Sequence, residues 1–254
     1  MVRICENDPK QRVRLVTAAV QAFTLRATGA AQTIISGQHD RQMDQSPAAR
    51  RETMPDSIMY HEGNRRLQDR FDSRRISDRL EEKQTRTEFS DNEKKFIENA
   101  SYFFLATADA EGRPDCSFKG GMPGFVRVTG AAELAFPDYD GNGMFKSLGN
   151  VLVNPHVGIL FIAMHGKGRR LRVNGIATVR EDDALLRQTV GAQLIVRVAA
   201  KAIFPNCPRY IPTMRLIEPS VYAPQAGHEA PEPKWKGFDD FKDCVHPRQQ
   251  TFKG

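Results

Sequence analysis

Residues 136–150 bring together the groups best suited to bind an anion. A strand-like run leads into a loop that contains Gly141 and Gly143, and a short helical pattern follows. Free N–H groups at the start of a helix, together with the helix dipole, favour a phosphate at that position. Lys146 and Ser147 lie in the predicted first turn, where they add a positive charge and a hydroxyl group. The alternative interpretation is an ordinary surface loop before a helix.

The segments on both sides of this loop add a specific signal. Four short motifs occur in order around it, at residues 103–121, 123–128, 154–161 and 169–177. Each motif is weak alone, but their order and spacing resemble the pyridoxamine 5'-phosphate oxidase-like family of FMN-binding split β-barrels. The resemblance covers residues 96–180, and a looser match to a subgroup extends from Tyr60 to Trp235.

The resemblance implies a set of cofactor contacts. The phosphate of FMN would meet Lys146, Ser147 and the backbone of Asn142 and Gly143. The family loop carries an Arg-Lys pair after a Ser, whereas here Phe145 precedes the lysine, so one charge is missing.

A strand before the loop is expected to supply the rest of the contacts. Ser117 and Lys119 align with the family strand that meets the flavin, and Lys119 is the candidate for the missing charge. Gly120 and Gly121 would let the backbone approach the flavin ring. Arg170 replaces a family glutamine that touches the cofactor. Without the resemblance, both lysines would be interpreted as ordinary solvated side chains and the two glycines as a bulge.

The implied protein is a homodimer with FMN at the interface, acting as an oxidoreductase on a small molecule or a nicotinamide cofactor. True pyridoxamine phosphate oxidation is not expected, because residues 214–219 lack the Arg- and Trp-rich substrate motif. Two alternatives stay open: a non-catalytic flavin- or haem-binding sensor or storage protein on the same barrel, and a basic interaction protein without a cofactor. No catalytic residue is assigned.

Composition narrows the class of protein. The net charge of +6 comes from scattered residues without a nucleic-acid recognition motif, so no nucleic-acid partner is expected. No apolar run reaches 18 residues, so no membrane span is expected. The six histidines and four cysteines show no metal-ligand spacing, and no metal site is assigned. The cysteine pattern favours a reducing cytoplasm.

The pattern along the chain predicts a mainly β protein, a split β-barrel with peripheral helices, because many short strands alternate with tight turns. Strands are predicted at residues 102–108, 115–119, 125–128, 133–136, 157–162, 170–179 and 194–203. Helices are predicted between residues 60 and 83, from the capping box at Ser90 to Asn99, and at residues 182–190. The aromatic residues expected in the core are Phe103, Phe104, Phe136 and Phe161.

Four segments follow from this pattern. They are an N-terminal extension at residues 1–53, a helical arm at 54–95, the FMN-binding barrel at 96–218 and a proline-rich C-terminal arm at 219–254. The N-terminal extension is expected to be non-native or disordered, with Met54 or Met59 as the working start of the protein.

Overall fold

The computed structural model describes residues 57–163 and 168–245. The predicted extension at residues 1–53 lies outside the described residues, as does most of the predicted turn at residues 165–168. Within the described ranges, none of the helices has the length and apolar character needed to cross a membrane.

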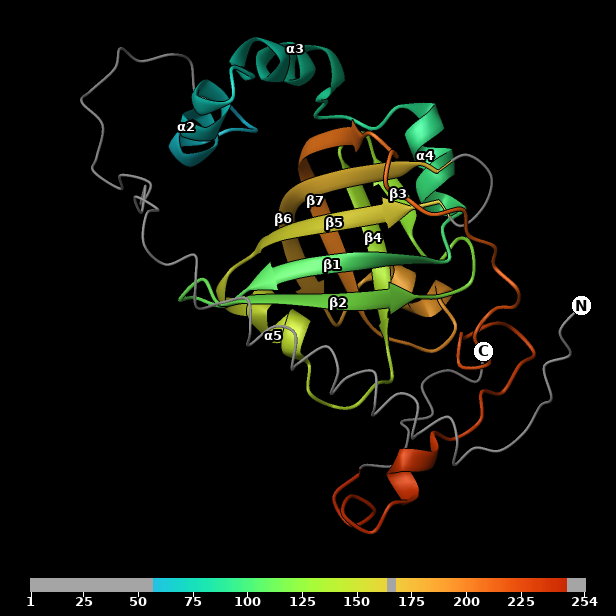
Figure 1. The fold of residues 1–254 in the computed structure, drawn as a ribbon. Helices are drawn as coiled ribbons and strands as arrows, with labels where there is room; N and C mark the ends of the chain where they lie inside the picture. The colour runs from blue at the N-terminus through green and yellow to red at the C-terminus, as the bar shows by residue number, and fades with distance from the viewer. Residues whose placement is uncertain (1–56, 164–167, 246–254) are drawn as a thin grey trace, which may run out of the picture. The chain divides into compact units, whose positions relative to one another are not determined.

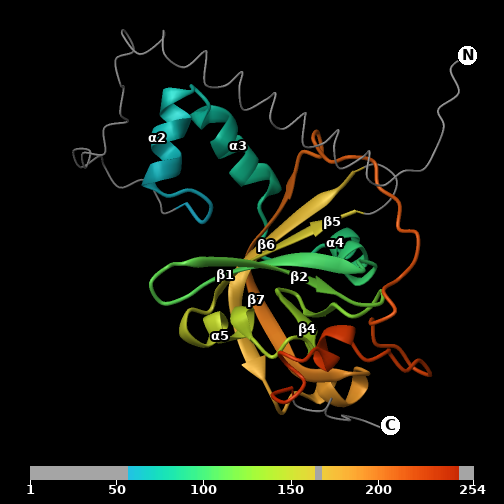
Figure 2. The same cartoon turned by 60° about the horizontal axis from the view of Figure 1, so that its bottom comes forward.

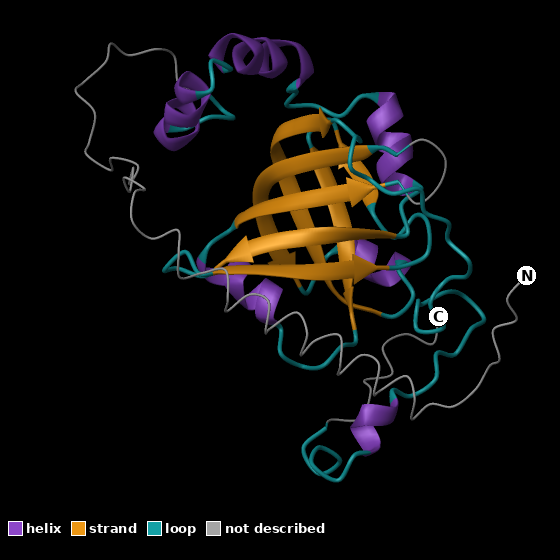
Figure 3. Ribbon diagram, viewed as in Figure 1, coloured by secondary structure: helices purple, strands orange, loops and turns teal. Residues whose placement is uncertain are grey.

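Seven antiparallel strands form one curved sheet in the order β2-β1-β5-β6-β7-β4-β3, and the sheet wraps into a barrel (Figures 1 and 3). The predicted mainly β split barrel is therefore confirmed. β2 and β3 lie at the two ends of the sheet, so the barrel has a seam where the ends approach each other. The strands are β1 (Tyr102–Ala108), β2 (Pro114–Gly120), β3 (Arg127–Gly130), β4 (Glu133–Tyr139), β5 (His156–Ile162), β6 (Arg170–Arg180) and β7 (Ala192–Asn206).

β4 and β7 are longer than predicted and end at Tyr139 and Asn206, and two other elements also differ from the sequence prediction. β3 begins at Arg127 rather than at residue 125, because Phe125 closes a turn with Met122 and stacks on Phe103 with ring centroids 5.8 Å apart. Residues 182–190 form a 3₁₀ turn, η1 (Ala184–Gln188), rather than a longer helix. Asp183 begins this turn by accepting a hydrogen bond from the backbone N–H of Leu185 at 2.9 Å.

Three of the four predicted core aromatics are in the core. Phe103, Phe136 and Phe161 are at most 1% exposed, and the ring of Phe103 contacts the rings of the other two. The prediction for Phe104 is wrong, because the alternation of β1 turns it to the outer face, where it meets Phe118.

The N-terminal helices pair through charged side chains. α2 (Glu62–Arg70) and α3 (Arg74–Gln84) confirm the predicted amphipathic helices. Ion pairs from Arg65 to Asp78 and from Arg74 to Asp69 hold the two together. The apolar side chains of the pair are 40–72% exposed, namely Leu80, Leu67, Ile76 and Phe71.

α4 (Asp91–Glu98) confirms the predicted capping box. Glu93 accepts hydrogen bonds from the backbone and hydroxyl of Ser90, both at 2.8 Å. Ile97 is fully buried in the main core, so the helix covers one end of the barrel (Figure 1).

Candidate functional site

The candidate site lies where α5 (Lys146–Val153) packs beside the edge strand β2, as both views of the fold show (Figures 1 and 2). Asp115, Ser117 and Lys119 alternate along β2 and share one face of it. Their cross-strand neighbours on β1 include the buried Phe103 and Leu105, so this face of β2 points to the inside of the barrel. The strand thereby presents three polar side chains at the seam.

The start of α5 has the features of an anion-binding site, called the phosphate seat below. Phe145 is the N-cap residue, and its side chain has no acceptor with which to cap the helix. No acidic residue lies in the first turn, where Lys146 is exposed. Within the part of the chain that the structure describes, Lys146 has no carboxylate partner.

The loop before α5 is bent into unusual backbone conformations. Gly143 has φ +73°, and Phe145 has φ +46° and ψ +28°, which a non-glycine residue rarely adopts. Asn142 stabilises the bend by accepting a hydrogen bond from the backbone N–H of Met144 at 3.1 Å. Strain of this kind costs about 1–3 kcal/mol and is frequent at binding sites.

Hydrogen bonds join α5 to the strands. The hydroxyl of Ser147 lies 2.8 Å from Ser117 Oγ and 3.1 Å from Asp115 Oδ2. One turn later, Asn150 donates to Thr107 Oγ1 at 3.0 Å in a buried contact. The helix start is thus held at a fixed position over β2.

Lys119 pairs with a buried carboxylate rather than standing free. Its Nζ lies 3.3 Å from Asp138 Oδ1, which links β2 to β4 across the seam. Burial raises the pKa of Asp138, and the attraction of Lys119 opposes this shift only in part. Lys119 was predicted to supply a second positive charge to the phosphate. In the structure the same ammonium group already forms an ion pair with Asp138.

The raised pKa of Asp138 predicts how stability depends on pH. A carboxyl group whose pKa is higher in the folded than in the unfolded protein stabilises the fold most below its ordinary pKa of about 3.9. That contribution is lost as the pH rises through the folded-state pKa. Asp138→Asn should therefore gain stability over the wild type as the pH rises from about 4, and then level off. Urea unfolding across this pH range measures the difference.

A second variant serves as the control. Lys119→Met removes the opposing charge, so its stability should fall more steeply with pH than that of the wild type. If the wild type instead gained stability relative to Asp138→Asn over this range, attraction to Lys119 would outweigh burial.

The remaining predicted residues have other neighbours in the structure. A Cβ atom on Gly120 would come within 2.7 Å of the Phe118 ring, and one on Gly121 within 2.6 Å of Phe125. These glycines therefore make room for the protein's own aromatic rings. Arg170 is on β6, three positions along the sheet from β2, and donates to the carbonyl of Cys207 at 2.5 Å. The structure joins Ser117 to Ser147 directly and places Lys119 on the same face of β2. Asn142, Gly143 and Lys146 lie in the loop and helix start that lead to Ser147, whereas Arg170 is three strands away.

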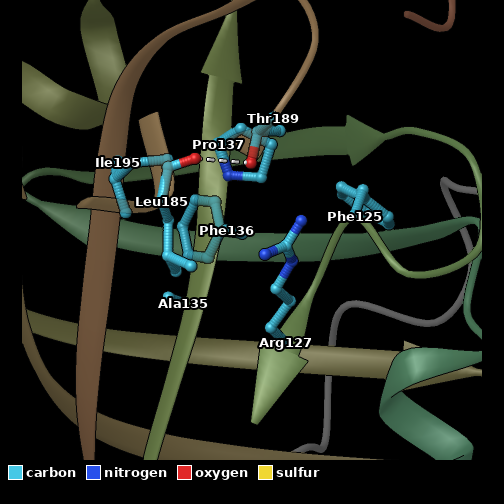
Figure 4. Close-up of a pocket in the computed structure, with 8 residues that line it drawn as sticks. All are labelled: Phe125, Arg127, Ala135, Phe136, Pro137, Leu185, Thr189 and Ile195. Atoms are coloured by element: carbon cyan, nitrogen blue, oxygen red, sulfur yellow. Dashed lines mark hydrogen bonds between the residues drawn. The ribbon is translucent and has the colours of Figure 1, made fainter. Parts of the chain in front are cut away.

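A separate shallow depression, open to solvent, lies between β3, β4, β7 and η1 (Figure 4). Phe136 and Ile195 line it together with Arg127, and Thr189 donates to the Leu185 carbonyl at 2.9 Å beside it. Pockets for ligands of cofactor size occupy about 300–1,000 Å³, whereas this depression encloses almost no space, so it does not hold a flavin.

The sequence contained a signal for two residues that the prediction missed. Asp115 is two residues from Ser117, and strand alternation alone places both on one face. Asn150 is three residues from Ser147, so helix periodicity places them together. Asp138 had no such signal, because its contact with Lys119 depends on how the barrel closes.

The family model described as pyridoxamine 5'-phosphate oxidase matches residues 89–221, which is more than half of the chain. The chain belongs to the pyridoxamine 5'-phosphate oxidase family. The match includes every strand of the barrel as well as α4 and α5. The family assignment expected from the four motifs is confirmed.

Solved structures that resemble the chain include three from bacteria. HupZ of Group A Streptococcus is 18% identical, with 46% of this chain and 93% of that chain covered and a TM-score of 0.38. HutZ, the heme storage protein from Vibrio cholerae, is 20% identical, with 44% and 91% covered and a TM-score of 0.35. General Stress Protein 26 from Bacillus anthracis is 16% identical, with 48% and 93% covered and a TM-score of 0.32. A comparison with curated protein sequences found no match.

The donor set of this family member fits the phosphate end of a flavin cofactor. The uncapped start of α5 and the exposed Lys146 supply N–H groups and a positive charge. The Ser147 hydroxyl is buried and already bonded to Ser117 and Asp115, so it adds an O–H group only by giving up one of these bonds. The Asp115 carboxylate next to Ser147 repels an anion, so Lys146 and the backbone N–H groups would supply most of the favourable contacts with the phosphate.

Proposed function

We propose that this chain binds FMN and works as an oxidoreductase on a small molecule or a nicotinamide cofactor. The observation that carries the proposal is the uncapped start of α5, with Lys146 exposed beside it and no acidic residue in the first turn. The membership of the chain in a family that commonly binds flavin supports the same cofactor.

The residues of the chain have binding and positioning roles in this proposal. Lys146 and the first N–H groups of α5 hold the phosphate, and Ser117 and Ser147 contribute hydroxyl groups. FMN itself supplies the hydride or electron transfer when it is bound. The buried link from Asn150 to Thr107 keeps the helix start in place, which limits the reorganisation needed on binding.

We also propose a homodimer with residues of both subunits at each flavin. The outer face of β1 and β2 carries an aromatic cluster. Its Phe118 is 62% exposed and stacks on Tyr102, with the two ring centroids 5.4 Å apart. Exposed apolar clusters of this kind usually mark interfaces, and two-fold dimers are the commonest homo-oligomers. Arg170 lies three strands from β2, so the contact predicted between Arg170 and the cofactor is proposed to come from the second subunit. Among the residues that the structure describes, Cys116, Cys207 and Cys244 are exposed free thiols, which favour the cytoplasm as the compartment.

The absorbance spectrum of the freshly purified full-length protein tests the cofactor. We expect a flavin spectrum, release of FMN on denaturation as identified by mass, and bleaching by NADH or NADPH without oxygen. Sedimentation over a dilution series, with and without FMN, tests assembly, because a site spanning two subunits requires that FMN strengthens the dimer.

Each alternative has its own outcome in this experiment. A bound flavin that neither NADH nor NADPH reduces would favour the non-catalytic binder. A Soret band in the absorbance spectrum would show that the bound cofactor is haem rather than FMN. Colourless protein that takes up no added FMN would overturn the cofactor proposal. A flavin-bound monomer at every concentration would overturn the shared site.

A further inference from the structure

The C-terminal segment 219–245 contacts the barrel next to the loop that leads to the proposed phosphate seat. At its first anchor, Pro224 packs on Gly191, where a Cβ atom would come within 2.8 Å of the proline ring. Ala223 beside it is only 8% exposed. Gly191 directly precedes Ala192, which pairs with Tyr139 at the end of β4. The segment is therefore fixed where β4 ends.

A second anchor ties the same segment to the first residue of the loop. Lys236, in the turn η2 (Lys234–Gly237), reaches Asp140 Oδ2 at 2.9 Å and Glu232 Oε1 at 3.1 Å. The Lys236 side chain is only 8% exposed, whereas Asp140 is 26% and Glu232 is 56% exposed. Figures 1 and 2 both draw η2 on the side of the barrel where β4 ends. Because the ammonium group is buried between two carboxylates, this contact is a structural ion pair rather than a solvent-exposed surface pair.

The loop that Lys236 anchors is short and strained. Only five residues separate Asp140 from Lys146, and they include the left-handed Gly143 and Phe145. Because a conformation of this kind persists only where its surroundings hold it, the ends of the loop must be fixed. The hydrogen bonds of Ser147 fix the far end, and Lys236 fixes the near end.

We propose that the C-terminal segment acts as a strap that sets the shape of the loop at residues 140–145, with Lys236 as the positioning residue. The inference rests on the proposed function, since the loop carries the FMN phosphate seat. Releasing the strap frees the start of the loop and weakens FMN binding. By linkage, FMN binding must in turn tighten the strap.

Lys236→Met in the full-length chain tests the proposal, with Lys242→Met as the matched control. Lys242 pairs with Asp239 in the same segment, but its side chain is 60% exposed and lies outside the loop contact. We expect Lys236→Met to weaken FMN about five- to tenfold, with riboflavin little affected, and Lys236→Arg to restore most of the affinity. Lys242→Met should match the wild type.

Amide hydrogen exchange supplies a readout that does not need the cofactor. Without FMN, exchange at residues 140–145 and 219–245 should be faster in Lys236→Met than in the wild type or Lys242→Met. With FMN, exchange in the wild-type strap should slow. If FMN affinity or loop exchange is the same in Lys236→Met and Lys242→Met, the strap proposal is overturned. If the wild type binds no FMN, the proposed function fails, and loop exchange alone then decides whether the strap sets the loop.

Discussion

Lys146→Ala is expected to weaken FMN binding by about tenfold or more. A charge-assisted contact contributes about 1.5–3 kcal/mol, and about 1.4 kcal/mol corresponds to a factor of ten in Kd. Lys146 is exposed in the first turn of α5, and no carboxylate among the described residues neutralises it, so its charge is available to the phosphate. Fluorescence titration of the apoprotein with FMN measures the loss.

Riboflavin provides the internal control, because it has the same ring and ribityl chain without the phosphate. Its affinity should be nearly the same in wild type and Lys146→Ala. Lys201→Ala, at an exposed lysine of β7, should leave both ligands unaffected. Equal losses for FMN and riboflavin would show that Lys146 does not meet the phosphate.

Gly175→Ala is expected to destabilise the barrel by about 1–3 kcal/mol or more. Gly175 lies at the register shift between β6 and β7, opposite Ala200. A Cβ atom there would come within 2.4 Å of the Ala199 carbonyl oxygen and 2.9 Å of Val198 Cγ1. Since the nearest atom belongs to the backbone of the neighbouring strand, the clash cannot be relieved by a side-chain rotation. Urea unfolding of the variant and the wild type measures the change.

Gly158→Ala is the matched substitution in another central strand. Its Cβ would meet only Asn174 Oδ1 at 3.6 Å and Ala106 Cβ at 3.7 Å, which are ordinary contacts. We expect this variant to keep nearly all of the wild-type stability. Similar losses in both variants would mean that the general cost of alanine in a strand, rather than the close approach at Gly175, explains the result.

Local sequence signals predicted the elements that depend on local physics. The run at residues 102–108 matches β1, and the capping box at Ser90 matches the start of α4. In both cases side-chain type and spacing act within a few residues. The helix after the Gly143 loop was predicted for the same reason, and it now carries the grouped part of the candidate site.

Features that depend on the closure of the sheet could not be predicted in this way. Which face of β1 enters the core decides that Phe104 lies outside, and the aromatic composition of the strand gives no indication of it. The pairing of Lys119 with Asp138 joins strands near opposite ends of the sheet order. The separation of Arg170 from the phosphate seat likewise becomes visible only when the strand order is known.

The long reach between β4 and β7 has a consequence for how the protein is made. β4 ends at Tyr139, but its partner β7 ends at Asn206, 67 residues later along the chain. At about 5–20 residues per second, a ribosome needs roughly 3–13 s to add that stretch. During this time β4 is paired only with β3, and its other edge can pair with other nascent chains. The interval between the two strands is therefore a stage of synthesis at which protection by chaperones is expected to matter.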